Sequence, residues 1–95
     1  MEQNKQNFEH AINSRQISGV FNVSGEYFLD FEFLDCSFQS CTIRGGSFSC
    51  SDFKKCSFKN VVFEDICLDY VRFEGCVLDE VRFKACSLDG LSFGV

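Results

Sequence analysis

Seven cysteines are the side chains of this 95-residue chain best suited to chemistry, because a thiolate can act as a nucleophile, bind a soft metal or form a disulfide. The number is odd, and five of them are separated by multiples of five residues: Cys36, Cys41, Cys56, Cys76 and Cys86. We therefore expect reduced, buried thiols that pack as small apolar side chains, and no disulfide framework of a secreted protein. Cys50 and Cys67 lie outside this series and could be reactive, but no activating base is evident near them.

Carboxylates are the second kind of side chain that could form a functional site, and they are unevenly distributed along the chain. Residues 1–25 hold two acids and two bases, so the net charge of −5 belongs to residues 26–95, where twelve acids face seven bases. Residues 26–35 carry four acids and no base, and residues 61–80 carry six acids and one base. Nucleic-acid binding needs Lys and Arg to neutralise phosphates. We therefore expect no direct nucleic-acid binding.

The elements that must position these groups repeat every five residues. A large apolar residue returns at each fifth position without an insertion, and a smaller or β-branched residue stands two positions before most of these centres. Two inward residues followed by a polar corner describe a short strand that turns and repeats. The centres are Phe28, Phe33, Phe38, Ile43, Phe48, Phe53, Phe58, Phe63, Leu68, Phe73, Leu78, Phe83, Leu88 and Phe93.

Segments such as CSFKN (56–60), VRFEG (71–75) and CSLDG (86–90) resemble the pentapeptide-repeat family. The frame of that family is a small residue, a polar residue, a central Leu or Phe, and two variable residues. The resemblance covers residues 26–95. It implies an all-β solenoid, namely a right-handed four-sided parallel β-helix with twenty residues per coil and about three and a half coils.

Twenty residues per coil imply columns of stacked side chains. One inner column is Phe33, Phe53, Phe73 and Phe93, and another is Cys36, Cys56 and Cys76. Three sulfurs in register could bind a soft metal, but these point in parallel into an apolar interior and lack a fourth ligand. We expect packing, with no metal and no cofactor; metal analysis and a count of accessible thiols would test the alternative redox or metal-binding role.

The two ends of the solenoid are expected to differ. Phe8, Ala11 and Ile12 share one face of a short amphipathic α-helix predicted within residues 3–14, which caps the first coil. Residues 1–25 form this cap and its lead-in, and residues 26–95 form the β-helix. The C-terminal end has no such cap, so its open apolar face is predicted to be an interface, formed by Leu88, Leu91, Phe93 and Val95.

Gyrase-directed members of the family dimerise through C-terminal coils, so the resemblance implies a possible homodimer through this end. A monomer with an open end is the alternative. The first coil also departs from the frame, because Glu26 and Phe31 occupy small-residue slots, while Leu29 and Leu34 occupy outward slots. We expect a distortion under the helix there, with Gly46 leaving room beside Glu26.

No catalytic site is predicted. Neighbouring acids such as Glu64 and Asp65 would lie on a convex surface without a cleft that desolvates them. His10, the one histidine, lies outside the repeat. The chain has neither a long apolar run nor the apolar stretch of a secretion signal, so we expect a non-enzymatic cytoplasmic protein that does not enter a membrane.

The carboxylates then become candidates for partner binding. In the implied coil, Glu64, Asp69, Glu74 and Asp79 follow a centre on each of the four sides and form a negative ring. A narrow anionic rod presents a field like that of DNA to a basic groove, and DNA mimicry is known for the gyrase-directed members. The predicted partner-binding residues are Asp30, Glu32, Asp35, Glu64, Asp65, Asp69, Glu74, Asp79 and Glu80.

The resemblance and the short length together suggest the kind of target. We expect an acidic DNA mimic that occupies a nucleic-acid-binding channel, of the anti-CRISPR type that phages and mobile elements direct against CRISPR effector complexes. Binding to DNA gyrase or another topoisomerase is the first alternative. A scaffold or interaction module without DNA mimicry is the second, because a moderate negative charge also serves solubility alone.

Overall fold

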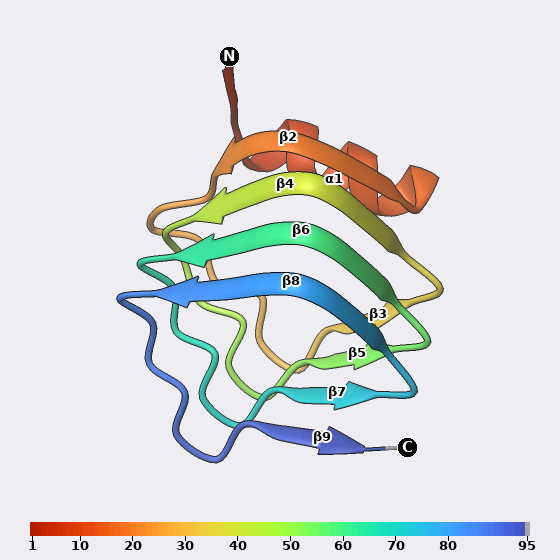
Figure 1. The fold of residues 1–95 in the computed structure, drawn as a ribbon. Coiled ribbons are helices and arrows are strands. Elements are labelled where there is room, and N and C mark those ends of the chain that lie inside the picture. Colours follow the sequence, from red (N-terminus) through yellow and green to blue (C-terminus); the bar gives the residue numbers. More distant parts are fainter. Residues whose placement is uncertain (95) are drawn as a thin grey trace.

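The computed structural model describes residues 1–94, which form one short helix and nine strands. Figure 1 shows the strands winding around a common interior, with the helix lying across the N-terminal end. In this part of the chain, no helix has the length and apolar character needed to cross a membrane. The elements are β1 Glu2–Gln3, α1 Lys5–Ser14, β2 Gln16–Asn22, β3 Glu32–Leu34, β4 Ser37–Arg44, β5 Asp52–Lys54, β6 Ser57–Glu64, β7 Arg72–Glu74, β8 Val77–Lys84 and β9 Ser92–Gly94.

The strands form two parallel sheets. The larger has the order β1-β2-β4-β6-β8, and the smaller has the order β3-β5-β7-β9. In the smaller sheet, each residue pairs with the residue twenty positions later, as in Phe33, Phe53 and Phe73, and β4, β6 and β8 keep the same spacing. One coil is therefore twenty residues, or four frames of five, and the predicted parallel β-solenoid is confirmed. We number the coils from the N-terminus as residues 16–35, 36–55, 56–75 and 76–94.

Corner residues in the left-handed backbone region explain why the chain turns every five positions. From position 30 to position 90, every residue whose number is a multiple of five has a positive φ, between 49° and 78°. Most L-residues avoid this region, so the hydrogen bonds and packing of the coil must compensate for it. At Ser40, Asn60 and Glu80 such corners bend β4, β6 and β8, so that each of these strands covers two sides of the coil.

The fourth side of the coil carries no regular strand in the described chain. Figure 1 shows it as the loops that join β4 to β5, β6 to β7 and β8 to β9. Isolated parallel bridges connect successive coils there through Tyr27, Ser47, Cys67 and Ser87. We call this side the bridge face, defined as residues 27–30, 47–50, 67–70 and 87–90.

Phenylalanine rings stack along the interior in the columns implied by the twenty-residue spacing. In the column of Phe33, Phe53, Phe73 and Phe93, successive ring centroids are 4.4, 5.1 and 5.3 Å apart, and the rings lie within 17° of parallel. Adjacent columns meet edge to face, as where Phe53 contacts Phe58 at 5.4 Å. Both arrangements are favourable for aromatic pairs. Stacked phenylalanines therefore fill much of the interior, beside aliphatic residues and cysteines.

Helix α1 closes the N-terminal end of this interior, as predicted. Phe8 is 1% exposed, and its ring packs edge to face on Phe28 and Phe48 with centroid distances of 5.5 and 6.0 Å. A capping box fixes the start of the helix, because the side chains of Asn4 and Asn7 each accept the other's backbone N–H. The apolar face of α1 therefore lies on the first coil.

Strand β2 extends the larger sheet into a segment that the five-residue frame did not reach. Ile17 pairs with Phe38, and Phe21 pairs with Ile43; Ile17 and Phe21 are both buried. These two inward residues are four positions apart, whereas their partners are five apart, and the register shifts between Ile17 and Gly19. The different spacing explains why the repeat could not be traced into β2.

The first coil is distorted where Glu26 replaces a small residue. Its carboxylate turns outward and lies 3.2 Å from the ammonium group of Lys5 on α1. One coil further on, a Cβ added at Gly46 would lie 2.6 Å from the carbonyl oxygen of Val23 and 3.2 Å from that of Glu26. Gly46 therefore gives the backbone of the first coil the room that it needs.

Phe31 is the second outward-turned residue of the first coil. It is 43% exposed, although its ring still packs against Phe33 at 4.7 Å. Ser51 follows it in the same column and is fully buried. The Ser51 hydroxyl donates to the carbonyl oxygen of Phe28 (2.6 Å) and accepts from the N–H of Phe31 (3.1 Å). A small polar residue thus ties the second coil to the distorted first coil.

Candidate functional site

The predicted acidic residues lie around the rod and do not form one patch. In the ring of four, Glu64 ends β6, Asp69 lies on the bridge face, Glu74 ends β7, and Asp79 lies on β8. Each of these residues therefore occupies a different side of the coil. The remaining predicted residues are Glu32 on β3 and the exposed corner residues Asp30, Asp35, Asp65 and Glu80.

Cross-coil ion pairs neutralise acids on the side formed by the smaller sheet. The guanidinium group of Arg72 donates two hydrogen bonds to Asp52, at 2.9 and 3.1 Å, and these hold the pKa of Asp52 below its usual range. The ammonium group of Lys54 lies 3.1 Å from the carboxylate of Glu32. Each pair joins one coil to the next, so these charges largely cancel on this side.

The side that contains the last residues of β4, β6 and β8 also pairs its charges. The Arg44 guanidinium bonds the Glu64 carboxylate and reaches Glu2 on β1 at 2.6 Å. The hydrogen bond from Arg44 lowers the pKa of Glu64. Lys84 is the partner of Glu64 in the next coil. Glu64 therefore lies between two bases, which weakens its expected role in attracting a basic partner.

The bridge face differs, because its three acids have no base beside them on that face. Asp30, Asp69 and Asp89 are its charged residues. Asp69 accepts hydrogen bonds from the Ser87 hydroxyl (2.6 Å) and from the backbone N–H of Asp89 (2.9 Å), and the first of these is the main cause of its lowered pKa. The carboxylate of Asp69 therefore stays anionic at neutral pH.

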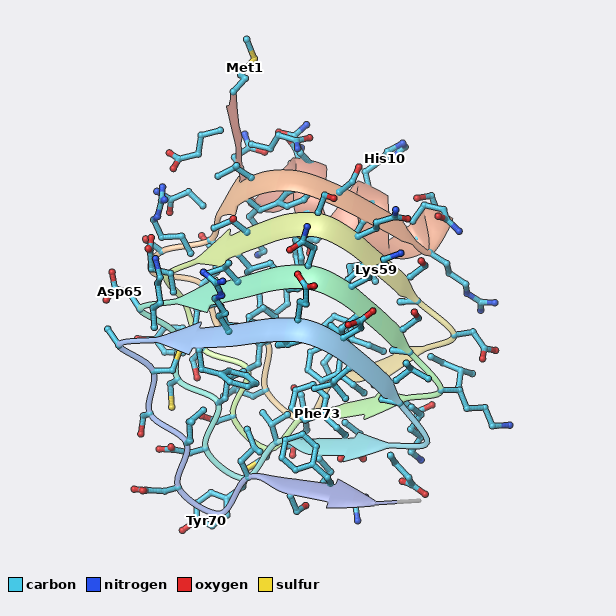
Figure 2. The ribbon with its side chains drawn as sticks, viewed as in Figure 1. Met1, His10, Lys59, Asp65, Tyr70 and Phe73 are labelled. Carbon is cyan, nitrogen blue, oxygen red and sulfur yellow. The ribbon has the colours of Figure 1, made fainter. Side chains whose placement is uncertain are left out.

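Asp89 is a residue of this face that the sequence analysis did not select. It follows Asp69 by twenty residues and so belongs to the same column, a signal that was present in the sequence. Figure 2 places Asp65 and Tyr70 at the two ends of the stretch that crosses the bridge face in the third coil. Asp65 is exposed at the corner before this face and adds to its negative charge.

Exposed aromatic and apolar side chains accompany these acids. Tyr27, Leu29 and Tyr70 are 73%, 57% and 62% exposed. The ring of Tyr70 lies against Gly90, where an added Cβ would be 2.4 Å from Cδ1 of the ring. Tyrosine is common in protein interfaces because it offers a rigid apolar surface with a polar tip. The bridge face therefore has the composition of a protein-binding surface.

The cysteine column has the surroundings of packing residues. The Sγ atoms of Cys56 and Cys76 donate to the carbonyl oxygens of Phe33 and Phe53, at 3.3 and 3.1 Å. The hydrogen bond between the Cys36 and Cys56 thiols, followed by burial, raises the pKa of Cys56, and the same bond lowers the pKa of Cys36; burial raises the pKa of Cys76. Protonated thiols are poor metal ligands and poor nucleophiles. All seven cysteines, which lie within the described residues, are free.

The two cysteines outside this series differ in exposure. Cys50 is exposed at a corner, and Cys67 is half-buried on the bridge face with its Sγ 3.2 Å from the Ser49 hydroxyl. His10 is exposed on α1. Within residues 1–94, no group of three or more His, Cys, Asp or Glu side chains has an arrangement suited to a metal ion.

The C-terminal end leaves apolar residues uncovered, as expected from the sequence. Leu88 and Phe93 are 40% and 61% exposed, and Leu91 is half-buried. Val95 lies outside the described residues. In that part of the chain, no strand pairs with the outer edge of β8 or β9. This end therefore presents both apolar side chains and unpaired backbone groups.

The structure is a β-solenoid built from five-residue units. Its coils pair in parallel, its corner residues have positive φ, and its interior contains stacked phenylalanines. The model of the family described as "Pentapeptide repeat region" matches residues 22–93, and the chain belongs to this family. Among solved structures, it is similar to trypsin-treated QnrB1, a plasmid-mediated fluoroquinolone resistance protein, with 13% sequence identity, 86% of this chain and 53% of that chain covered, and a TM-score of 0.45. The chain thus spans about half the length of that protein. A comparison with curated proteins found no match.

Proposed function

We propose that this chain is a non-enzymatic inhibitor that binds another protein through the bridge face, at a surface where that protein binds nucleic acid. The observation that carries the proposal is the presence of Asp30, Asp69 and Asp89 on one side without a base, while ion pairs cancel acids on two of the other sides. A stiff anionic surface attracts a basic groove over long range and competes there with DNA.

DNA gyrase or another topoisomerase is the first target to examine. The chain belongs to the pentapeptide-repeat family over residues 22–93, and members of this family that inhibit gyrase act as DNA mimics. The nucleic-acid channel of a CRISPR effector complex is the second target. Its support is size: the longest dimension of the chain is 34 Å, which corresponds to roughly ten base pairs at ~3.4 Å per pair, a length suited to a small channel inhibitor.

The test compares two charge-reversal variants of equal net charge. Asp30→Lys with Asp89→Lys changes the bridge face, and Asp79→Lys with Glu80→Lys, at two exposed residues of β8, is the matched control on another side. Corner positions accept Lys, because Lys55 itself has φ 54°. We expect the bridge-face variant to bind gyrase or the CRISPR complex roughly tenfold more weakly at low salt, with little change in the control.

The readouts are inhibition of supercoiling by gyrase, and direct binding to each target with and without competing duplex DNA. Equal losses in both variants would mean that charge matters but the bridge face does not. Unchanged inhibition in both variants would rule out charge mimicry and leave the scaffold or interaction module as the better description.

We also propose that two copies pair through the open C-terminal end, because Leu88 and Phe93 are exposed there beside unpaired strand edges. Sedimentation should then show a dimer that becomes a monomer in the Leu88→Ser, Phe93→Ser variant. Leu29→Ser removes a comparably exposed side chain at the other end and should leave the dimer intact. A wild-type protein that sediments as a monomer at the highest concentration reached would contradict this pairing.

A further inference from the structure

A groove runs between α1 and the first coil. It consists of two neighbouring hollows, of about 400 Å³ and about 200 Å³, which share Ile12, Asn13, Phe31 and Phe33 in their walls. Phe28 adds to the larger hollow, and Leu34 adds to the smaller. Because the hollows share four residues, they form one elongated depression, which we call the cap groove.

The walls of the cap groove are more apolar than the outer surface of an ordinary coil. Phe31 has left the interior and is 43% exposed, while Leu34 is 38% exposed in an outward slot. The corresponding outward residues in the next two coils are the charged Lys54 and Glu74. Contiguous exposed apolar side chains with a polar rim are typical of interaction sites. The distortion of the first coil has therefore left an exposed apolar depression.

The rim of the cap groove is acidic. Glu9 lines the larger hollow, while Asp30 and Asp35 are exposed corner residues on either side of Phe31 and Phe33. None of these three acids belongs to an ion pair within the described chain. Arg15 is the base that lines the groove. An occupant with positive charges on both sides of its apolar part would meet these carboxylates.

We propose that the cap groove binds a large apolar side chain carried by a basic segment of a partner protein. The occupant must be apolar to fill the space beside Phe31, and its flanking residues must be basic to face Asp30 and Asp35. A second copy of this chain fits poorly, because each copy has a net charge of −5. The inference rests on the proposed function in one respect: the segment would belong to the same basic surface that the bridge face contacts.

Peptides test the groove without any assumption about the target. We would titrate the protein with GKKGFGKKG, GKKGSGKKG and GEEGFGEEG, and follow the methyl resonances of Ile12 and Leu34 by NMR. The first peptide should bind at least tenfold more tightly than the second, because burying a Phe side chain favours association by more than about 1.4 kcal/mol. It should also bind more tightly than the third. Equal affinity for the Phe and Ser peptides, or for the basic and acidic peptides, would overturn the proposal.

Variants of the groove show whether it is the surface that binds the peptides. Leu34→Ser changes an outward side chain that lines the groove, so the fold should persist, and affinity for GKKGFGKKG should fall about tenfold. Val77→Ser is the matched control, because Val77 is 64% exposed on the distant strand β8. Equal losses in both variants would overturn the proposal. So would conversion of a wild-type dimer to a monomer by Leu34→Ser, since the occupant would then be a second copy.

The two proposals fail separately. If the peptides do not distinguish Phe from Ser but the bridge-face charge variant still loses its target, the groove is not a site and the proposed function stands. If the peptides bind as expected but charge reversal leaves inhibition intact, the groove remains a site for basic segments and DNA mimicry fails.

Discussion

The two ends of the solenoid contain the same repeat, but α1 covers only the N-terminal end. Phe33 in the first coil and Phe93 in the last occupy one column, yet they are 1% and 61% exposed. Figure 1 shows α1 across the first coil and β9 at the opposite end. Each repeat buries its inward face only against a neighbour. Burial in this protein therefore depends on position in the stack as much as on residue type.

The largest effect expected from this comparison is in the middle of the phenylalanine column. Phe53→Ala should lower the free energy of unfolding by about 3–5 kcal/mol, because Phe53 is 1% exposed and its removal leaves a cavity between stacked rings. Phe93→Ala should cost about 1 kcal/mol or less at protein concentrations low enough for the chain to be monomeric, because Phe93 is then 61% exposed. Urea unfolding followed by circular dichroism measures both. Equal costs would show that the last coil is covered in solution.

Weakening the contact between α1 and the first coil should leave the N-terminal end as poorly covered as the C-terminal end. Phe8→Ala should cost about 3 kcal/mol in free energy of unfolding, because the ring is buried against Phe28 and Phe48. Gln6→Ala, at an exposed position of the same helix, is the control and should have little effect. A cost for Phe8→Ala no larger than that of the control would mean that the first coil is stable without α1.

The covered coils should also respond to alkaline pH. Burial raises the pKa of Cys41 to about 12, from an ordinary value of 9.0. As the pH rises, the Cys41 thiol ionises in the unfolded chain before it ionises in the folded protein. The contribution of the neutral, buried thiol to the free energy of unfolding is therefore complete below pH 9 and is lost as the pH rises toward 12. At pH 10.5 the loss should be about 2 kcal/mol, measured as urea midpoints at pH 8 and pH 10.5.

The matched control is Cys41→Val, because Val61 and Val81 occupy the same column in the next two coils. This variant should lose less stability than the wild type over the same pH interval. Cys86, which lies near the open end, is less deeply buried and titrates in both proteins. An identical pH dependence in the wild type and the variant would show that Cys41 is not the responsible group.

The smallest effect concerns the start of the cap. Asn4→Ala removes the side chain that accepts the N–H of Asn7 at 3.0 Å, and should lower the free energy of unfolding by about 1 kcal/mol. Asn13→Ala, at an exposed position near the other end of α1, is the comparison. A larger cost for the second change than for the first would place the stabilising contacts of α1 at its C-terminal end instead.

Much of the fold could be predicted from the residues, because the repeat is local. The five-residue spacing indicated which side chains face inward, and Phe8 with Ile12 indicated a capping helix. Strand β2 was missed, because Ile17 and Phe21 are four positions apart and break the frame. Similarly, the candidate site was found only in part. Asp30 and Asp69 were selected and lie on the bridge face, but Asp89 was not.

Charge cancellation was the part of the site that sequence reasoning did not reach. Glu32 and Glu64 were selected because they belong to acidic stretches of sequence, yet each contacts a base 20 or 22 positions away. Composition along the chain counts neighbours in sequence, whereas electrostatic interactions act over a few ångströms in space. The acidic stretches of the chain are thus not the acidic surface of the protein.

The sequence by itself determined the period, the inward residues, the polar corners and the excess of negative charge, because each depends on residues within one five-residue unit or on composition. The tertiary structure decided which charges remain unpaired, which apolar residues stay exposed, and where α1 leaves a groove. These properties depend on contacts between coils and on which coils have a neighbour, and such contacts exist only once the chain has been wound.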